Sequence, residues 1–160
     1  MDKELVLYFS VYGTAKHVAE EIARQTGAAL REIVPEVPYD GDREHYPALL
    51  RVAQKEHDTD ARPAIKESLP IADYDRIYIG YPMWCYTFPM ILYTLFDQYD
   101  FSGKTIIPFN THMGSRDGGT YETIRKLAPK ANVIEGLPVE MNDAETPPAK
   151  LVEQWLHNLE

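Results

Sequence analysis

The segment LVLYFSVYGTAKHVAEEIARQTG, from Leu5 to Gly27, constrains the fold of this chain more than any other. Five consecutive apolar residues are followed by a short loop with one glycine and then by an amphipathic helical pattern. A strand that is apolar at every residue is buried on both faces, which is typical of parallel sheets. The helix ends at Gly27, and its apolar face carries Ala15, Val18, Ala19, Ile22 and Ala23. With a second strand over 30–34, the segment predicts a β-α-β unit.

The rest of the chain continues this alternation. The patterns predict strands over 74–80, 105–109 and 133–139, and helices over 46–57, 89–99, 121–127 and 147–159, the last capped by Thr146. Strands that alternate with helices predict an α/β fold: a doubly wound, five-stranded parallel sheet with helices on both faces. We expect a single domain over residues 1–160.

The composition limits the partners of the protein. The net charge is −9, which repels nucleic acid and anionic membranes and favours partners with basic surfaces, although such a charge also simply keeps a protein soluble. The single cysteine, Cys85, excludes an intramolecular disulfide and a multi-cysteine zinc site. No apolar stretch is long enough to cross a bilayer, and the apolar run near the N-terminus is too short for a signal peptide. We expect a cytoplasmic protein that binds neither nucleic acid nor membranes.

The first loop of interest is Ser10–Ala15, where the first strand gives way to the helix. Ligands of open parallel sheets bind beyond the carboxyl ends of the strands. Ser10 and Thr14 offer hydroxyl groups, Gly13 allows close approach of the backbone, and the helix start offers free N–H groups and a positive dipole end. These features suit a phosphate. The alternative is an ordinary turn in which Thr14 caps the helix.

The second loop, GYPMWCYTFP, follows strand 74–80 and is rich in aromatic residues. A loop tryptophan with a free face, here Trp84, suits stacking on a flat ligand. The same residues would equally form a hydrophobic plug over the sheet edge or a protein-binding patch.

The third loop, residues 110–119, holds three glycines among short polar side chains. Its backbone amides can hold the edge of a heteroaromatic ring, although glycines also simply make loops. A loop for a phosphate, one for stacking and one for a ring edge together indicate a phosphorylated planar ligand. The histidines show no metal-ligand spacing and no hydrolase motif is present, so we predict neither a metal site nor a catalytic residue.

These motifs, in order along essentially the whole chain, resemble those of short-chain bacterial flavodoxins. Ser10-Val11-Tyr12-Gly13-Thr14-Ala15 occupies the family's phosphate-loop pattern Thr/Ser-x-Thr-Gly-x-Thr, GYPMW resembles the loop with a stacking Trp, and NTHMGS resembles the third loop beside the flavin. The segments RPAIKESLP and YDFSGKTIIPF are similar to a bacterial subgroup of the superfamily. The resemblance implies a sheet of strand order 2-1-3-4-5 and FMN as the cofactor.

The resemblance also implies roles for residues. The first loop would hold the phosphate, Trp84 with Tyr86 or Met83 would pack on the ring, and backbone groups of the second and third loops would meet its edge. The predicted cofactor-binding residues are Ser10, Val11, Tyr12, Gly13, Thr14, Ala15, Pro82, Met83, Trp84, Cys85, Tyr86, Asn110, Thr111, His112, Gly114 and Ser115. The chain departs from the family at Tyr12 and Ala15, which replace hydroxyl positions, and at Tyr86, which replaces a frequent glycine.

Three functions are open at this point. The leading one is an FMN-binding electron carrier between protein partners that have basic docking surfaces. The alternative is an FMN-dependent NAD(P)H:quinone-type oxidoreductase, which adds NAD(P)H and a small quinone-like acceptor. The third, from another class, is a binding module that kept the fold and lost the flavin, which the departures at Tyr12 and Ala15 motivate.

Overall fold

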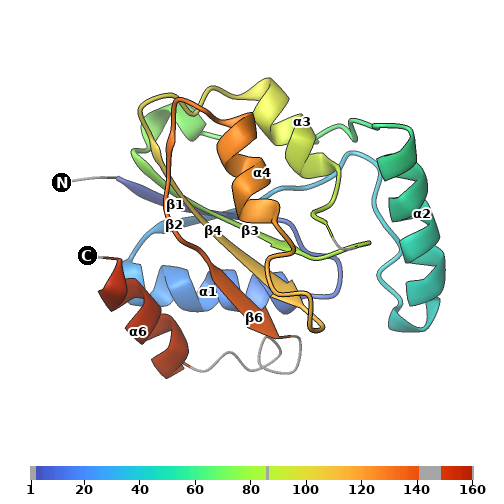
Figure 1. Ribbon diagram of the computed structural model, residues 1–160, viewed down its shortest axis with the longest axis horizontal. Coiled ribbons are helices and arrows are strands. Elements are labelled where there is room, and N and C mark those ends of the chain that lie inside the picture. Colours follow the sequence, from blue (N-terminus) through green and yellow to red (C-terminus); the bar gives the residue numbers. More distant parts are fainter. Residues whose placement is uncertain (1–2, 86, 141–148, 160) are drawn as a thin grey trace.

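The computed structural model describes residues 3–85, 87–140 and 149–159, which are built around a parallel sheet (Figure 1). The strands are β1 (Glu4–Tyr8), β2 (Ala29–Glu32), β3 (Arg76–Pro82), β4 (Thr105–His112), β5 (Asn132–Val133) and β6 (Leu137–Glu140). They pair in the order β2-β1-β3-β4-β5, with β6 also beside β4, and all these pairings are parallel. The predicted α/β fold with strand order 2-1-3-4-5 is confirmed.

The helices lie close to their predicted positions. They are α1 (Thr14–Thr26), α2 (Tyr46–Asp58), α3 (Ile91–Gln98), α4 (Thr120–Leu127) and α6 (Ala149–Asn158). Two 3-10 turns, η1 (Arg43–His45) and η2 (Ile71–Asp73), precede α2 and β3. Pro89 opens a turn before α3, because its carbonyl accepts from the N–H of Leu92 at 3.0 Å. The predicted cap Thr146 lies outside the described residues.

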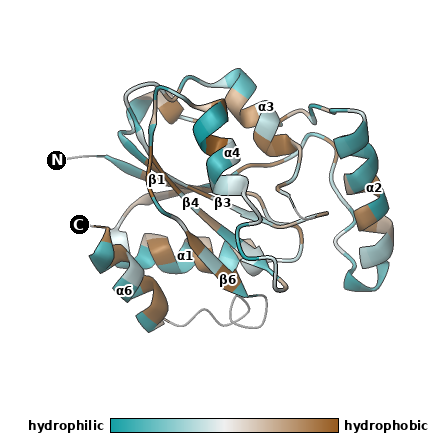
Figure 2. Cartoon of the chain, viewed as in Figure 1, coloured by the Kyte–Doolittle hydropathy of each residue, from teal (hydrophilic) through white to brown (hydrophobic). Residues whose placement is uncertain are grey.

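Alternate residues of β1 face opposite sides of the sheet, as the period of a strand requires. Leu5 and Leu7 pack with residues of α3 and α4, whereas Val6 and Tyr8 pack with residues of α1 and α6. Figure 1 shows these two pairs of helices on the two sides of the sheet. All four helices mix apolar and polar residues (Figure 2), as expected of helices that cover a sheet on one side and meet water on the other.

The last strand differs from the prediction of one continuous strand over 133–139. Residues 134–136 interrupt it, so β5 pairs with the beginning of β4 and β6 with its end. Gly136 lies in this break, where an added Cβ would be 2.3 Å from the carbonyl oxygen of Pro108 and 2.7 Å from the ring of Tyr121. The backbone therefore passes too close to β4 and to the α4 side chain Tyr121 for any residue larger than glycine.

Helix α2 stands at one end of the molecule (Figure 1). The turn η1 that leads into it is held by two aspartates: the Asp42 carboxylate accepts from the backbone N–H of Glu44 at 3.0 Å, and the Asp40 carboxylate contacts the His45 ring at 2.6 Å. These are the local bonds by which aspartate favours turns and helix starts. Only Leu49 and Ala53 of α2 are buried. Like α6, α2 buries only two residues, so contacts at its ends help to fix its position.

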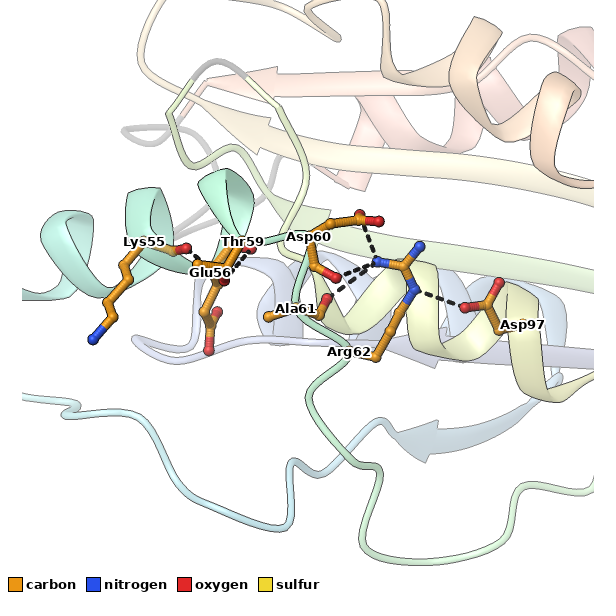
Figure 3. Close-up of polar contacts among 7 residues, drawn as sticks. All are labelled: Lys55, Glu56, Thr59, Asp60, Ala61, Arg62 and Asp97. Atoms are coloured by element: carbon orange, nitrogen blue, oxygen red, sulfur yellow. Dashed lines mark hydrogen bonds and ion pairs between the residues drawn. The ribbon is translucent and has the colours of Figure 1, made fainter.

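Arg62 fixes the chain just after α2. Figure 3 shows its guanidinium between Asp60, which follows α2, and Asp97 of α3, with contacts of 2.7 Å to each. The guanidinium also lies 5.0 Å from the ring centroid of Tyr93. A single exposed ion pair contributes little, but three contacts through one side chain define the geometry more firmly. Arg62 therefore ties the end of α2 to α3.

We predict that Gly80→Ala lowers the free energy of unfolding by about 1–3 kcal/mol, as overpacking in a core does. Gly80 pairs with Phe109 in the sheet, and an added methyl group would lie 2.1 Å from ring atoms of Phe109. Chemical denaturation of both proteins measures the difference. Gly41→Ala is the control, because a Cβ there approaches nothing closer than the carbonyl oxygen of Val11 at 3.7 Å. Equal losses at the two positions would contradict the prediction.

Candidate functional site

A cavity of about 870 Å³ lies beyond the carboxyl ends of β1, β3 and β4. Its walls come from the three loops singled out in the sequence and from α2. The volume is in the upper part of the range of roughly 300–1,000 Å³ that is typical of small-molecule pockets. The edge of the sheet at which a ligand was expected is therefore hollowed.

The first loop places the start of α1 at this cavity. Val11, Tyr12 and Thr14 line it. Gly13 is the N-cap of α1 with φ 93°, and no side chain caps the helix. The Ser10 hydroxyl accepts from the N–H of Gly13 at 3.0 Å and so shapes the loop. The alternative in which Thr14 caps the helix is wrong.

Two members of the first loop take interior positions. Thr14 is 3% exposed, and its hydroxyl lies 3.3 Å from the hydroxyl of Thr111 at the end of β4. Ala15 is fully buried. The uncapped helix start, with its N–H groups and positive dipole end, has the properties of an anion site.

Tyr12 departs from the family pattern and packs on α2. Its ring centroid is 5.9 Å from that of Tyr46, and the guanidinium of Arg43 is at the same distance from the Tyr12 ring. The Tyr12 hydroxyl oxygen is buried and has no hydrogen-bond partner among the described residues. Burial, and next Tyr46, raise the pKa of Tyr12, so the hydroxyl keeps its proton and can donate.

The second loop contributes Pro82, Met83, Trp84 and Cys85 to the cavity wall. The Trp84 side chain is only 3% exposed, and its ring makes T-shaped contacts with Phe9 at 5.4 Å and Tyr39 at 5.3 Å between centroids. This packing is of the kind expected of a hydrophobic plug over the sheet edge, the alternative that the sequence left open for this loop. Stacking of Trp84 on a flavin stays a prediction, and Tyr86 lies outside the described residues.

Cys85 occupies a tight turn. Trp84 and Thr87 exchange backbone hydrogen bonds of 2.8 and 2.9 Å, and Cys85, which follows Trp84, has φ 52°. The thiol donates to the carbonyl of Leu50 in α2 at 3.6 Å. Burial, and next Asp58, raise the pKa of Cys85, so the sulfur is a neutral thiol rather than a nucleophile.

The third loop is shaped by Asn110, which is fully buried. Its Nδ2 donates to the carbonyl of Arg116 at 2.8 Å, and its Oδ1 accepts from the hydroxyl of Tyr121. Asn110 thus organises the loop from inside. The cavity itself is lined by Thr111, His112, Gly114 and Ser115, together with Met113 and Gly118, which the sequence did not single out.

His112 is held in one tautomer. It is 5% exposed, and its Nδ1 accepts from the N–H of Gly114 at 2.9 Å. Burial lowers the pKa of His112, Arg116 lowers it further, and Glu140 acts in the opposite direction. A neutral ring whose Nδ1 accepts carries its proton on Nε2, so His112 offers one N–H donor at the cavity.

The α2 wall is the part that sequence analysis missed. Tyr46, Leu50 and Gln54 line the cavity, four residues apart along the helix and therefore on one face. The spacing was visible within the predicted helix 46–57. The sequence did not reveal that α2 stands beside the strand ends rather than over the sheet.

Within the described ranges, no group of three His, Cys, Asp or Glu residues could hold a metal ion. No helix among these residues is long and apolar enough to cross a membrane.

A family model described as Flavodoxin matches residues 3–159 of the chain. Comparison with curated proteins finds no match.

Solved structures show the same likeness over nearly the whole chain. Two are described as a "putative flavoprotein". The one from Bacteroides eggerthii DSM 20697 is 32% identical, with a TM-score of 0.82, and the match covers 98% of this chain and 97% of that one. The one from Bacteroides uniformis ATCC 8492 is 30% identical, with a TM-score of 0.85 and 98% of both chains covered. A flavoprotein from Lactobacillus acidophilus NCFM in complex with FMN is 26% identical, with a TM-score of 0.71. The match covers 91% of this chain and 97% of that one.

We predict that His112 titrates below the ordinary value of 6.5 and makes the protein less stable in acid. Because the unfolded chain takes up this proton at higher pH than the folded one, the free energy of unfolding falls as the pH drops below that value. An NMR titration of the His112 ring and urea unfolding at several pH values measure both effects. His112→Asn keeps an acceptor for the N–H of Gly114 and cannot titrate. An unchanged pH dependence in this variant would contradict the prediction.

Proposed function

Since the chain belongs to the flavodoxin family, we propose that it is an FMN-binding redox protein that carries electrons between protein partners. One observation supports FMN binding most directly. The three loops that the resemblance assigns to FMN meet at a single cavity, next to a helix start that no side chain caps.

The phosphate of FMN fits the start of α1. Gly13 adopts a backbone conformation that only glycine reaches without strain, and the first turn of the helix keeps its N–H groups free of a side-chain cap. Such N–H groups, aligned with the helix dipole, are a common phosphate site. The Thr14 hydroxyl lies beside them. Backbone groups therefore take over what the missing hydroxyls at Tyr12 and Ala15 do in the family pattern.

The ring of FMN fits between the second and third loops. Met83 offers a polarisable thioether for packing on an aromatic face, and His112 offers the Nε2–H for an acceptor at the ring edge. When bound, FMN supplies a ring that accepts and releases electrons singly or in pairs, and the protein controls its potential and its access. The exposed Met113, with 76% of its surface accessible, lies at the same cavity, where a partner protein can contact it.

The charge of the chain favours basic protein partners. A net charge of −9 attracts a positively charged surface over a distance and raises its rate of association at low salt.

The NAD(P)H:quinone-type oxidoreductase is the second candidate, and the flavin-free binding module is the third. A single domain over residues 1–160 and a cytoplasmic location stay predictions.

We predict that the purified protein retains FMN through gel filtration and shows flavin absorption bands in the near-ultraviolet and blue. Gly13→Ala is expected to weaken FMN binding about tenfold, which corresponds to about 1.4 kcal/mol. Alanine is strained at φ 93°, and relief of that strain moves the N–H groups of the helix start.

Gly27→Ala is the matched control, because Gly27 ends the same helix at φ 74° with no atom within 4 Å of an added Cβ. It should lose similar stability and keep its FMN affinity. Equal FMN affinities in the two variants would show that the phosphate lies elsewhere. If the wild-type protein never retains FMN, the flavin-free binding module is the candidate function that the result supports.

We also predict that the FMN-loaded protein oxidises NADH and NADPH no faster than free FMN does. After photoreduction it should pass electrons to a small basic haem protein, at a rate that falls as salt rises because the attraction between opposite charges is screened. Stopped-flow absorption at several ionic strengths measures this rate, with an acidic haem protein as the control. Steady turnover of NAD(P)H with a soluble quinone would instead support the reductase.

A further inference from the structure

The cavity has a wall that the three FMN loops do not provide. Tyr46, Leu50 and Gln54 of α2 form it; Tyr46 and Leu50 are half-buried, and Gln54 is exposed. Tyr12, from the first loop, extends this wall, since its ring packs at 5.9 Å from that of Tyr46. An aromatic pair beside an aliphatic side chain offers apolar, flat contact area, which favours a flat ligand.

Tyr12 also provides a polar group within this wall. Its hydroxyl is buried and has no partner among the residues that the structure describes. A buried hydroxyl without a partner is costly, and a ligand oxygen that accepts its proton removes that cost. The matching group on a flat ligand is a carbonyl.

The cavity favours uncharged ligands on this side. Its described lining contains no Lys, Arg, Asp or Glu, His112 is neutral, and Cys85 is a protonated thiol. A charged molecule would lose its hydration among these lining residues. The guanidinium of Arg43 lies 5.9 Å from the Tyr12 ring but is not among the residues that line the cavity. The lining therefore suits a neutral aromatic molecule.

We propose that Tyr12, Tyr46 and Leu50 form a second ligand subsite, for a flat, uncharged, carbonyl-bearing ring of the quinone class. The subsite rests on the proposed function, because FMN would occupy the start of α1 and the second and third loops, while Tyr12 of the first loop borders both ligands. It makes a small molecule, held against α2, a second binding partner of the FMN-loaded protein.

Duroquinone and durene test the subsite. Both are flat, uncharged and carry four methyl groups, and only duroquinone has carbonyl groups. Every C=C carbon of duroquinone is methylated, so it resists addition of the Cys85 thiol. Equilibrium dialysis against oxidised, FMN-loaded protein, without an electron donor, measures binding alone. We expect duroquinone to bind at least fivefold more tightly than durene. Equal affinities for the two probes, or no binding of duroquinone, would overturn the proposal.

Leu50→Glu should weaken duroquinone binding at least tenfold, because it places a carboxylate in the apolar wall. Val52→Glu is the matched control: Val52 is 47% exposed on the same helix but lines a separate cavity with Tyr39 and Glu56. Circular dichroism establishes that both variants are folded. Equal weakening in the two variants, or none in Leu50→Glu, would overturn the proposal.

Tyr12→Phe separates hydrogen bonding from packing. It should reduce duroquinone binding to the level of durene and leave durene binding unchanged, a difference that a merely structural change would not produce. The absorption of FMN in each dialysed sample distinguishes a failure of the subsite from a failure of FMN binding. Retained FMN without selective duroquinone binding overturns the subsite alone, and loss of FMN from the wild type overturns both proposals.

Discussion

The burial of the central strands on both faces is the constraint from which the site follows. Leu5, Val6 and Leu7 are all fully buried, although they face opposite sides of the sheet, and β3 and β4 are equally enclosed. Side chains in the middle of such strands cannot reach a ligand. The groups that can do so come from the last residues of the strands, such as Thr111 and His112, and from the loops beyond them, where β1, β3 and β4 stop close together. The cavity, the uncapped start of α1 and the folded-back third loop all lie there.

The walls of this cavity are held in place by different kinds of contact. The FMN loops rise directly from the sheet, and Asn110 fixes the third loop from within the core. Helix α2 is instead positioned by contacts at its two ends, through Asp40 and Asp42 before it and Arg62 after it. Tyr39 links the two parts, since its ring contacts Trp84 and its hydroxyl donates to Glu56 of α2 at 2.8 Å. The wall formed by α2 is thus attached to the FMN loops mainly through aromatic side chains.

What the sequence could predict depended on local patterns. The strand, glycine loop and helix from Leu5 to Gly27 were visible in residue order, as were the other helices and the strand order that the resemblance implied. The break at Gly136 was not, because it depends on the distant ring of Tyr121. The burial of Trp84 depends on Tyr39, in a segment with weak patterns, and periodicity says nothing about which part of the molecule α2 would border.

The dependence of α2 on its ends has an evolutionary consequence. The three loops that we propose hold FMN are joined directly to the strands of the sheet, so substitutions there disturb the core as well as the cavity. Substitutions on the cavity face of α2 change one wall and leave the sheet intact, because only Leu49 and Ala53 of this helix are buried. Such a helix can diversify quickly while the fold is conserved. A change in this one short segment can therefore reshape one wall of the cavity while the loops at the strand ends stay the same.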